Sequence, residues 1–164
     1  MKFFVKNNYL FNETDSFRCA IGLGGTTKEK IEGDQCTPIG EFKFNKIYYR
    51  SDKLGKLDFL IPSAEISFED GWCDDTENKF YNQFVKFPFD GSAERLHRED
   101  DLYDIVCVMN YNTEPVIPGK GSAIFLHVCK NNFTHTLGCV AVKKEVLLKI
   151  SRQINENTTI TIEG

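Results

Sequence analysis

One stretch decides the fold of this chain, Ser122-Ala-Ile-Phe-Leu-His127-Val-Cys129-Lys-Asn-Asn-Phe-Thr-His135-Thr136-Leu137-Gly138-Cys139-Val-Ala141. Its first apolar run predicts a strand over Ala123–Val128, which contains His127 next to its end. A polar loop follows, and Gly138 and Cys139 then lead into a second apolar segment. This order of segments predicts that an imidazole and a thiol meet at neighbouring elements of a β structure.

A thiol beside an imidazole is suited to nucleophilic catalysis. A free thiol has a pKa of about 8.5 and is mostly protonated at neutral pH, whereas an adjacent imidazole stabilises the thiolate. Gly138 lets the backbone bend sharply, and we expect its amide and that of Cys139 to be free to bind an oxyanion. Alternatively, Cys139 is a buried core residue and His127 is a hydrogen-bonded structural group. His135 is a second candidate for the base, or is simply exposed on its loop.

The rest of the chain is typical of a mostly β protein, because short β-branched and aromatic runs alternate with Gly, Pro, Asn or Asp. The expected strands are Lys2–Lys6, Tyr9–Asn12, Phe17–Gly22, Gly40–Tyr49, Asp58–Ile61, Tyr103–Met109, Ala123–Val128 and Thr158–Ile162. Asn7 and Asn8 predict a hairpin turn that opens a meander, since Asn tolerates the left-handed conformation.

One helix is expected, over Lys143–Asn155, and its apolar stripe should lie on the sheet. The stripe consists of residues at three- and four-residue spacing, Val146, Leu147, Ile150 and Ile154. The polar and aromatic region Ser63–Arg98 predicts loops or short turns that cover one end of the sheet. We therefore expect a single domain over residues 1–164.

Length and charge exclude several classes of protein. The chain has 164 residues, which is the size of one domain, and a net charge of −4 without a basic block, so we expect no nucleic-acid partner. Its apolar runs are far shorter than the ~20 residues of a membrane-spanning helix. The N-terminus lacks the apolar core of a secretory signal. The six cysteines form no compact disulfide framework, so we expect reduced thiols.

Cofactor and metal motifs are missing from the sequence. It has no phosphate-binding loop, and the glycines of Gly22–Gly25 do not complete a dinucleotide fingerprint. Zinc sites use three or four ligands, but the chain has only three histidines and no Cys-x-x-Cys pair. We expect neither a cofactor nor a metal.

Three blocks of sequence resemble the L,D-transpeptidase catalytic domain, also called the YkuD domain. The first is His127 followed by Thr136-x-Gly138-Cys139-Val140. The second is the run Glu32-Gly-Asp-Gln-Cys-Thr-Pro-Ile-Gly-Glu-Phe42, and the third comprises Gly71-Trp72-Cys73-Asp74-Asp75, Glu94-Arg95 and Leu102-Tyr103-Asp104. The blocks keep the order of the family and span nearly the whole chain.

The resemblance implies a mostly β, sandwich-like or barrel-like domain with one helix near the C-terminus. It implies a cysteine enzyme that acts on peptidoglycan stem peptides or muropeptides, with Cys139 as nucleophile and His127 as general base. Gly138 and Cys139 would supply oxyanion amides, and Thr136 would position the turn or contact substrate. The thioester formed at the diamino acid would pass to an amine of a second stem and cross-link the third residues of both. The alternatives are an L,D-carboxypeptidase that hydrolyses the same bond and a non-catalytic binding module.

Two positions depart from the pattern of many members. Leu137 replaces a histidine, so His127 must be oriented by another group, and we expect a backbone carbonyl. Ala141 replaces an arginine, and Arg95 or Arg98 are the candidates for binding substrate charge in its place. Trp72 is expected either to line a substrate groove or to anchor its loop.

The expected location follows from two opposing indications. The resemblance places the protein in the periplasm or cell wall, where peptidoglycan lies. The absence of a recognisable signal allows a cytoplasmic protein acting on a recycled muropeptide. The sequence leaves the oligomeric state open.

Overall fold

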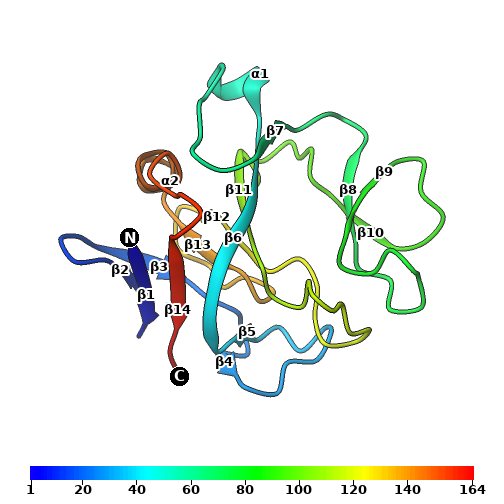
Figure 1. The fold of residues 1–164 in the computed structure, drawn as a ribbon, viewed down its shortest axis with the longest axis horizontal. Coiled ribbons are helices and arrows are strands. Elements are labelled where there is room, and N and C mark those ends of the chain that lie inside the picture. Colours follow the sequence, from blue (N-terminus) through cyan, green and yellow to red (C-terminus); the bar gives the residue numbers. More distant parts are fainter.

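Eight strands close into a mixed barrel in the computed structural model, which describes residues 1–164 (Figure 1). A ninth strand, β7, extends the sheet beside β6. Around the barrel the order is β11 (Ile105–Met109), β12 (Phe125–Val128), β13 (Val140–Val142), β3 (Ser16–Ala20), β2 (Tyr9–Phe11), β1 (Lys2–Lys6), β14 (Thr159–Ile162) and β6 (Gly40–Tyr49). Pairing of β6 with β11 closes the ring. The predicted mostly β, barrel-like fold is confirmed.

Two neighbouring pairs in the barrel are parallel, β1 with β14 and β12 with β13, and the others are antiparallel. The turn between β1 and β2 has positive φ at Asn7 (51°) and Asn8 (62°), and Lys6 lies opposite Tyr9. These values confirm the predicted hairpin, because Asn tolerates the left-handed region. Strand β3 continues antiparallel to β2 and completes the predicted meander.

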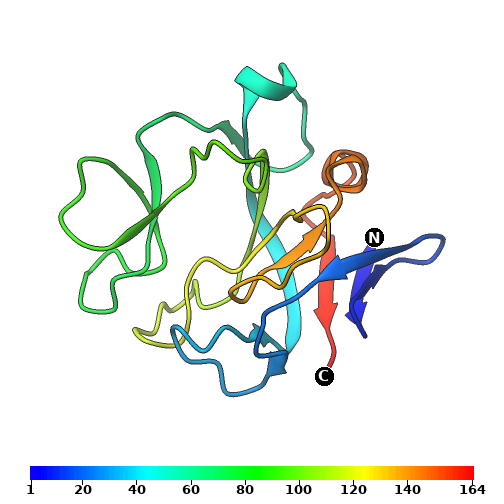
Figure 2. The same ribbon diagram turned by 180° about the vertical axis from the view of Figure 1, so that it is seen from behind.

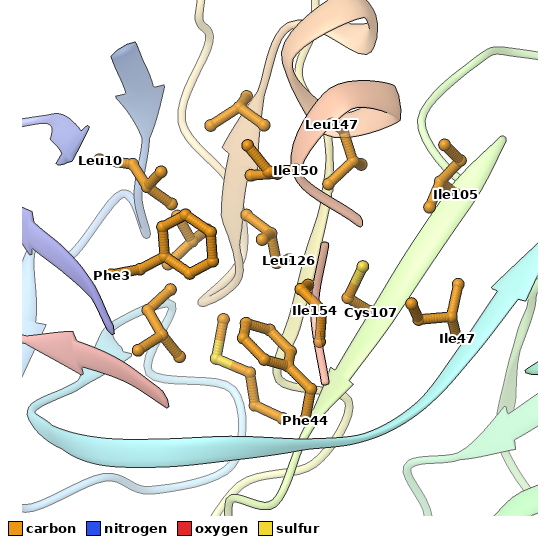
Figure 3. Packing of buried hydrophobic residues seen from close by; sticks show 14 of the residues in the cluster. Phe3, Leu10, Phe44, Ile47, Ile105, Cys107, Leu126, Leu147, Ile150 and Ile154 are labelled. Carbon is orange, nitrogen blue, oxygen red and sulfur yellow. The ribbon is translucent and has the colours of Figure 1, made fainter. Parts of the chain in front are cut away.

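The main core fills the barrel and continues under α2 (Lys144–Ser151). Leu147 and Ile150 of α2 are fully buried, and Figure 3 shows them above Leu126 of β12. The helix is shorter than the expected range, but Ile154 beyond its end is also fully buried. The apolar stripe therefore packs on the barrel as predicted, although its last member lies outside the helix. Neither helix of the fold is long and apolar enough to cross a bilayer.

The prediction of loops over residues 63–98 is wrong in part, because this region contains a separate three-stranded sheet. Its strands are β8 (Asp70–Cys73), β9 (Phe84–Lys86) and β10 (Ala93–Arg95), with β8 in the centre. Both views place this sheet on the side of the molecule opposite β1 and β2 (Figures 1 and 2). Strands of three or four residues are too short to produce a clear alternating pattern.

The expected strand at Asp58–Ile61 is wrong, since β7 (Ser63–Glu65), and not this segment, pairs with β6. Leu60 is 67% exposed there and finds no partner strand. A second helix, the single turn α1 (Ser51–Leu54), precedes this segment and was not expected. Short strands β4 (Thr26–Thr27) and β5 (Thr37–Pro38) pair with each other at one end of the barrel.

Candidate active site

The parallel pair β12 and β13 carries the two residues singled out by the sequence. In its register Leu126 lies opposite Val140, and His127 lies opposite Ala141. Cys139 directly precedes β13, and its Sγ accepts a hydrogen bond from the Phe125 amide at 3.4 Å. Side chains alternate along a strand, so Cys139 and His127 share one face of this pair. Both line a cavity of about 740 Å³.

His127 is held as a neutral imidazole. Its ring is buried, and Nδ1 lies 2.8 Å from the Val128 carbonyl oxygen. Nδ1–H therefore donates to this carbonyl, and Nε2 keeps a free lone pair. Burial lowers the pKa of His127 to about 4, although the nearby carbonyls of Val128 and Leu102 oppose this shift. The expectation that a backbone carbonyl orients His127 is confirmed.

Cys139 rests as a thiol. Its Sγ donates to the Ala123 carbonyl at 3.1 Å, and no hydrogen bond joins it to His127. Burial, followed by the negative charge of Glu94, raises the pKa of Cys139 to about 12, against the smaller opposing effects of the Phe125 amide and Lys30. The Cys139 thiol and the His127 imidazole are therefore both neutral in this structure.

The turn before Cys139 is fixed by Thr136. Its hydroxyl donates to the Cys139 carbonyl at 2.6 Å and accepts from the Gly138 amide at 3.1 Å. The Gly138 amide is therefore not free for an oxyanion, contrary to expectation, whereas the Cys139 amide makes no hydrogen bond in the chain. Gly138 has φ +138°, and a Cβ there would lie 3.0 Å from the Cys36 carbonyl oxygen. Its role is to let the turn pass close to the backbone of Cys36.

A second buried hydroxyl supports this turn from the family-like run at residues 32–42. Thr37 is fully buried, accepts a hydrogen bond from the Gly22 amide at 2.8 Å and donates to the Cys139 carbonyl at 3.5 Å. Two threonine hydroxyls thus hold the backbone carbonyl of Cys139.

The predicted cationic residues separate in the structure. Arg98 lines the cavity, and its guanidinium lies over the Tyr103 ring at 5.3 Å while binding both oxygens of Asp100 at 2.8 and 2.7 Å. Arg95 does not reach the cavity; it stacks on Phe87 at 4.0 Å and donates to the Phe68 carbonyl. Its neighbour Glu94 lines the cavity, and Arg95 therefore lies on the other face of β10, because side chains alternate along a strand.

Trp72 is part of the core and not of the cavity wall. Its side chain is buried, its Nε1 donates to Asn82 Oδ1 at 2.9 Å, and its ring packs edge-on against Phe125. The alternative of a structural anchor therefore describes Trp72, because no ring face is left for a ligand. His135 and Leu137 lie at the rim of the cavity, both exposed.

Glu94 and Tyr103 belong to the site, although from the sequence they were named only as members of a family-like block and assigned no role. The Tyr103 hydroxyl donates to Glu94 Oε1, and the Tyr103 ring meets the His127 ring edge-on at 5.3 Å. Glu32 and Asp74 line the same cavity. These residues come from four separate segments, so their resemblance to family blocks could mark them, but only the fold shows that they meet in one cavity. No three His, Cys, Asp or Glu side chains gather in a metal-binding arrangement.

Comparison with protein families gives one match, to the L,D-transpeptidase catalytic domain called YkuD, over residues 2–162. The match covers the barrel, the three-stranded sheet and the cavity. A search of curated proteins found no match. A barrel that presents a cysteine after the Thr-x-Gly turn and a histidine on the neighbouring strand agrees with this assignment, and the chain therefore belongs to the YkuD family of L,D-transpeptidase catalytic domains.

Proposed function

We propose that the protein is a cysteine-dependent L,D-transpeptidase that acts on peptidoglycan stem peptides through a thioester. The observation that carries this proposal is the shared cavity of Cys139 and His127, in which a thiol and an imidazole with a free Nε2 lie on adjacent strands. Family membership supports L,D-transpeptidase-type activity. The peptide substrate and the residue roles are our inference.

The first half-reaction begins when a carbonyl carbon reaches Cys139. The carbonyl joins the diamino acid at the third position of the stem to D-Ala. His127 Nε2 takes the thiol proton, Sγ attacks the carbonyl carbon, and the Cys139 amide stabilises the oxyanion. The C–N bond then breaks as His127 returns the proton to the departing amine of D-Ala. The products are free D-Ala and a thioester on Cys139.

The second half-reaction transfers the acyl group. An amine of another stem attacks the thioester carbon and its proton moves to Nε2; the C–S bond then breaks, and the departing Cys139 thiolate takes the proton from His127. If water replaces the amine, the product is a shortened stem, and the protein is an L,D-carboxypeptidase. Arg98 and Thr136 are our candidates for contact with the stem, because both line the cavity.

A carbapenem adduct measured by intact mass spectrometry tests this proposal, because the strained lactam acylates an active nucleophile. We expect one adduct on the wild type and none on Cys139→Ser. Cys129→Ser is the matched control, since Cys129 lines the same cavity but lies beyond the strand end. His127→Ala should slow the reaction by about 10²-fold or more, the usual contribution of a general base.

The outcome is decided by two comparisons. An adduct that persists in Cys139→Ser contradicts the assignment of Cys139 and means that another group is acylated. Absence of any adduct on folded wild type favours a binding module. Stem tetrapeptides incubated with and without an amine acceptor then separate transfer from hydrolysis, because only transfer gives a cross-linked product.

A further inference from the structure

Three carboxylates line the cavity without an ion-pair partner in the chain, those of Glu32, Asp74 and Glu94. These three residues are partly buried, and the two fully buried aspartates of the chain are both paired. Asp70 binds Lys86 at 2.8 Å, and Asp104 binds Lys53 and Lys144. Burying an unpaired charge costs free energy, so unpaired carboxylates gathered in a cavity favour a cationic ligand.

Asp74 supplies an independent indication of a missing donor. Its Oδ1 atom is buried and has no hydrogen-bond partner. Buried carboxylate oxygens are nearly always satisfied, and a ligand that donates a proton or carries a positive charge satisfies them. Asp74 follows the central strand β8 of the small sheet, and Glu94 lies on its neighbour β10.

Of the three carboxylates, Glu94 is the one connected to Cys139 and His127. Its Oε1 accepts the Tyr103 hydroxyl, and Tyr103 packs in one cluster with Cys139 while its ring meets His127. Burial raises the pKa of Glu94, and the charges of Asp74 and Glu32 add to this effect. Arg98 opposes it, but Arg98 gives Nε and Nη2 to Asp100 and forms no ion pair with Glu94.

The charge of Glu94 also acts on the nucleophile. Among the groups around Cys139, the Glu94 carboxylate disfavours the thiolate and Lys30 favours it. Lys30 is buried, and its ammonium is held in place by Asp34 at 2.5 Å and by the Ile31 carbonyl. Tyr103 and His127 are neutral, because burial raises the pKa of the phenol and lowers that of the imidazole. Glu94 is thus the group whose charge a ligand can cancel.

We propose that Glu94 binds an ammonium group of the acyl donor, and that cancelling the Glu94 charge in this way favours ionisation of the Cys139 thiol. The inference rests on the proposed function and names its donor class, a peptide with a free ammonium near the scissile bond. The diamino acid of a stem peptide carries such a group. A donor without the ammonium leaves Cys139 as a thiol and reacts slowly.

Glu94→Gln tests both parts of the proposal, because it should raise the intrinsic reactivity of Cys139 and reduce the preference for a donor with a free amine. Gln keeps the oxygen that accepts the Tyr103 hydroxyl and removes the charge. We expect iodoacetamide, a neutral reagent, to alkylate Cys139 about tenfold faster below its pKa, as for a shift of about one pKa unit. We expect the wild type to prefer a tetrapeptide donor with a free amine over the same peptide N-acetylated at that amine. This preference should fall about tenfold in Glu94→Gln.

Two further variants complete the design. Glu65→Gln makes the same charge change at an exposed position of β7 outside the cavity and should behave as wild type in both assays. Asp74→Asn should weaken the preference for the free amine and serves if Glu94→Gln does not fold. Alkylation at Cys139 is measured by peptide mapping, which separates it from the other five thiols.

The results distinguish this inference from the proposed function. If wild-type Cys139 reacts with neither reagent nor peptide, the proposed function is wrong. If Cys139 reacts but Glu94→Gln changes neither rate, Glu94 has no role in activation. If Glu94→Gln slows alkylation and acylation by the same factor, Glu94 is only structural, and the inference is overturned.

Discussion

Burial sets the charge of His127 more strongly than any neighbouring group does. The ring lies on a strand whose four residues are all buried, so water cannot stabilise the imidazolium. The same environment keeps Cys139 protonated. The site therefore holds neutral partners at rest, and it differs from cysteine enzymes that rest as a thiolate and imidazolium pair.

The low pKa of His127 makes stability depend on pH. Its ordinary value of 6.5 applies to the unfolded chain, and the folded value is about 4. As the pH falls below 6.5, the unfolded state binds a proton that the native state does not bind. The free energy of unfolding therefore decreases until about pH 4. Between about pH 7 and about pH 5 we expect this residue to lower the free energy of unfolding by roughly 2 kcal/mol.

Urea unfolding of the wild type and of His127→Gln at both pH values measures this loss. Gln retains an amide donor for the Val128 carbonyl but does not titrate. The difference in unfolding free energy between the two proteins should change by about 2 kcal/mol in favour of the variant at the lower pH. Parallel pH profiles for the two proteins would show that the pKa of His127 is the same in the native and unfolded states.

Local sequence was sufficient to find Cys139, His127 and Thr136, because they lie within one short stretch and the glycine marks the turn. It was insufficient for Glu94 and Tyr103, whose significance depends on one hydrogen bond between separate segments. It misplaced Trp72, since an aromatic residue in a polar region has the same local pattern whether its ring faces a ligand or the core.

At the level of elements, long strands were predictable and short ones were not. The ten residues of β6 match the predicted Gly40–Tyr49. By contrast, β13 has only three residues, and it was expected merely as an apolar segment. The strands of the small sheet pack on the barrel through Trp72 and Phe84, and no local periodicity encodes such tertiary contacts.

Strand β14 provides a direct test of barrel closure, because it lies between β1 and β6. Ile160 is fully buried, and its neighbour Thr161 is partly exposed. We expect Ile160→Ala to lower the free energy of unfolding by about 2–5 kcal/mol, the range for emptying a core position. The matched variant Thr161→Ala should change it by less than about 1 kcal/mol. Chemical denaturation checks both, and similar losses at the two positions would argue against this closure.

On the scale of the whole molecule, the active-site cavity lies where two structures of unequal size meet. The barrel supplies Cys139 and His127, and the three-stranded sheet region supplies Glu94 and Asp74. The barrel contains a core cluster of 21 buried residues, whereas the cluster under the small sheet has nine. A small sheet with fewer buried contacts opens at a lower free energy than the barrel.

Native-state hydrogen exchange can measure this difference. We expect amides of β9 and β10 to exchange through local opening, at rates at least about tenfold faster than those of β6 and β11. Addition of a carbapenem that reacts with Cys139 should slow exchange in β10, because the adduct fills the cavity between the two parts. Equal protection throughout the chain would mean that the molecule unfolds only as one unit.

The parallel pairing of β12 and β13 obliges the chain to travel back along the barrel between Val128 and Val140. The returning segment forms the rim of the cavity with Lys130, Thr134, His135 and Leu137. Strand register fixes the positions of the Cys139 thiol and the His127 imidazole, whereas these rim side chains are exposed and support no core. Under the proposed function, the reacting groups and the side chains that meet the substrate lie in different parts of one short stretch, and we expect exchange of these rim residues between relatives to change specificity without changing the reaction.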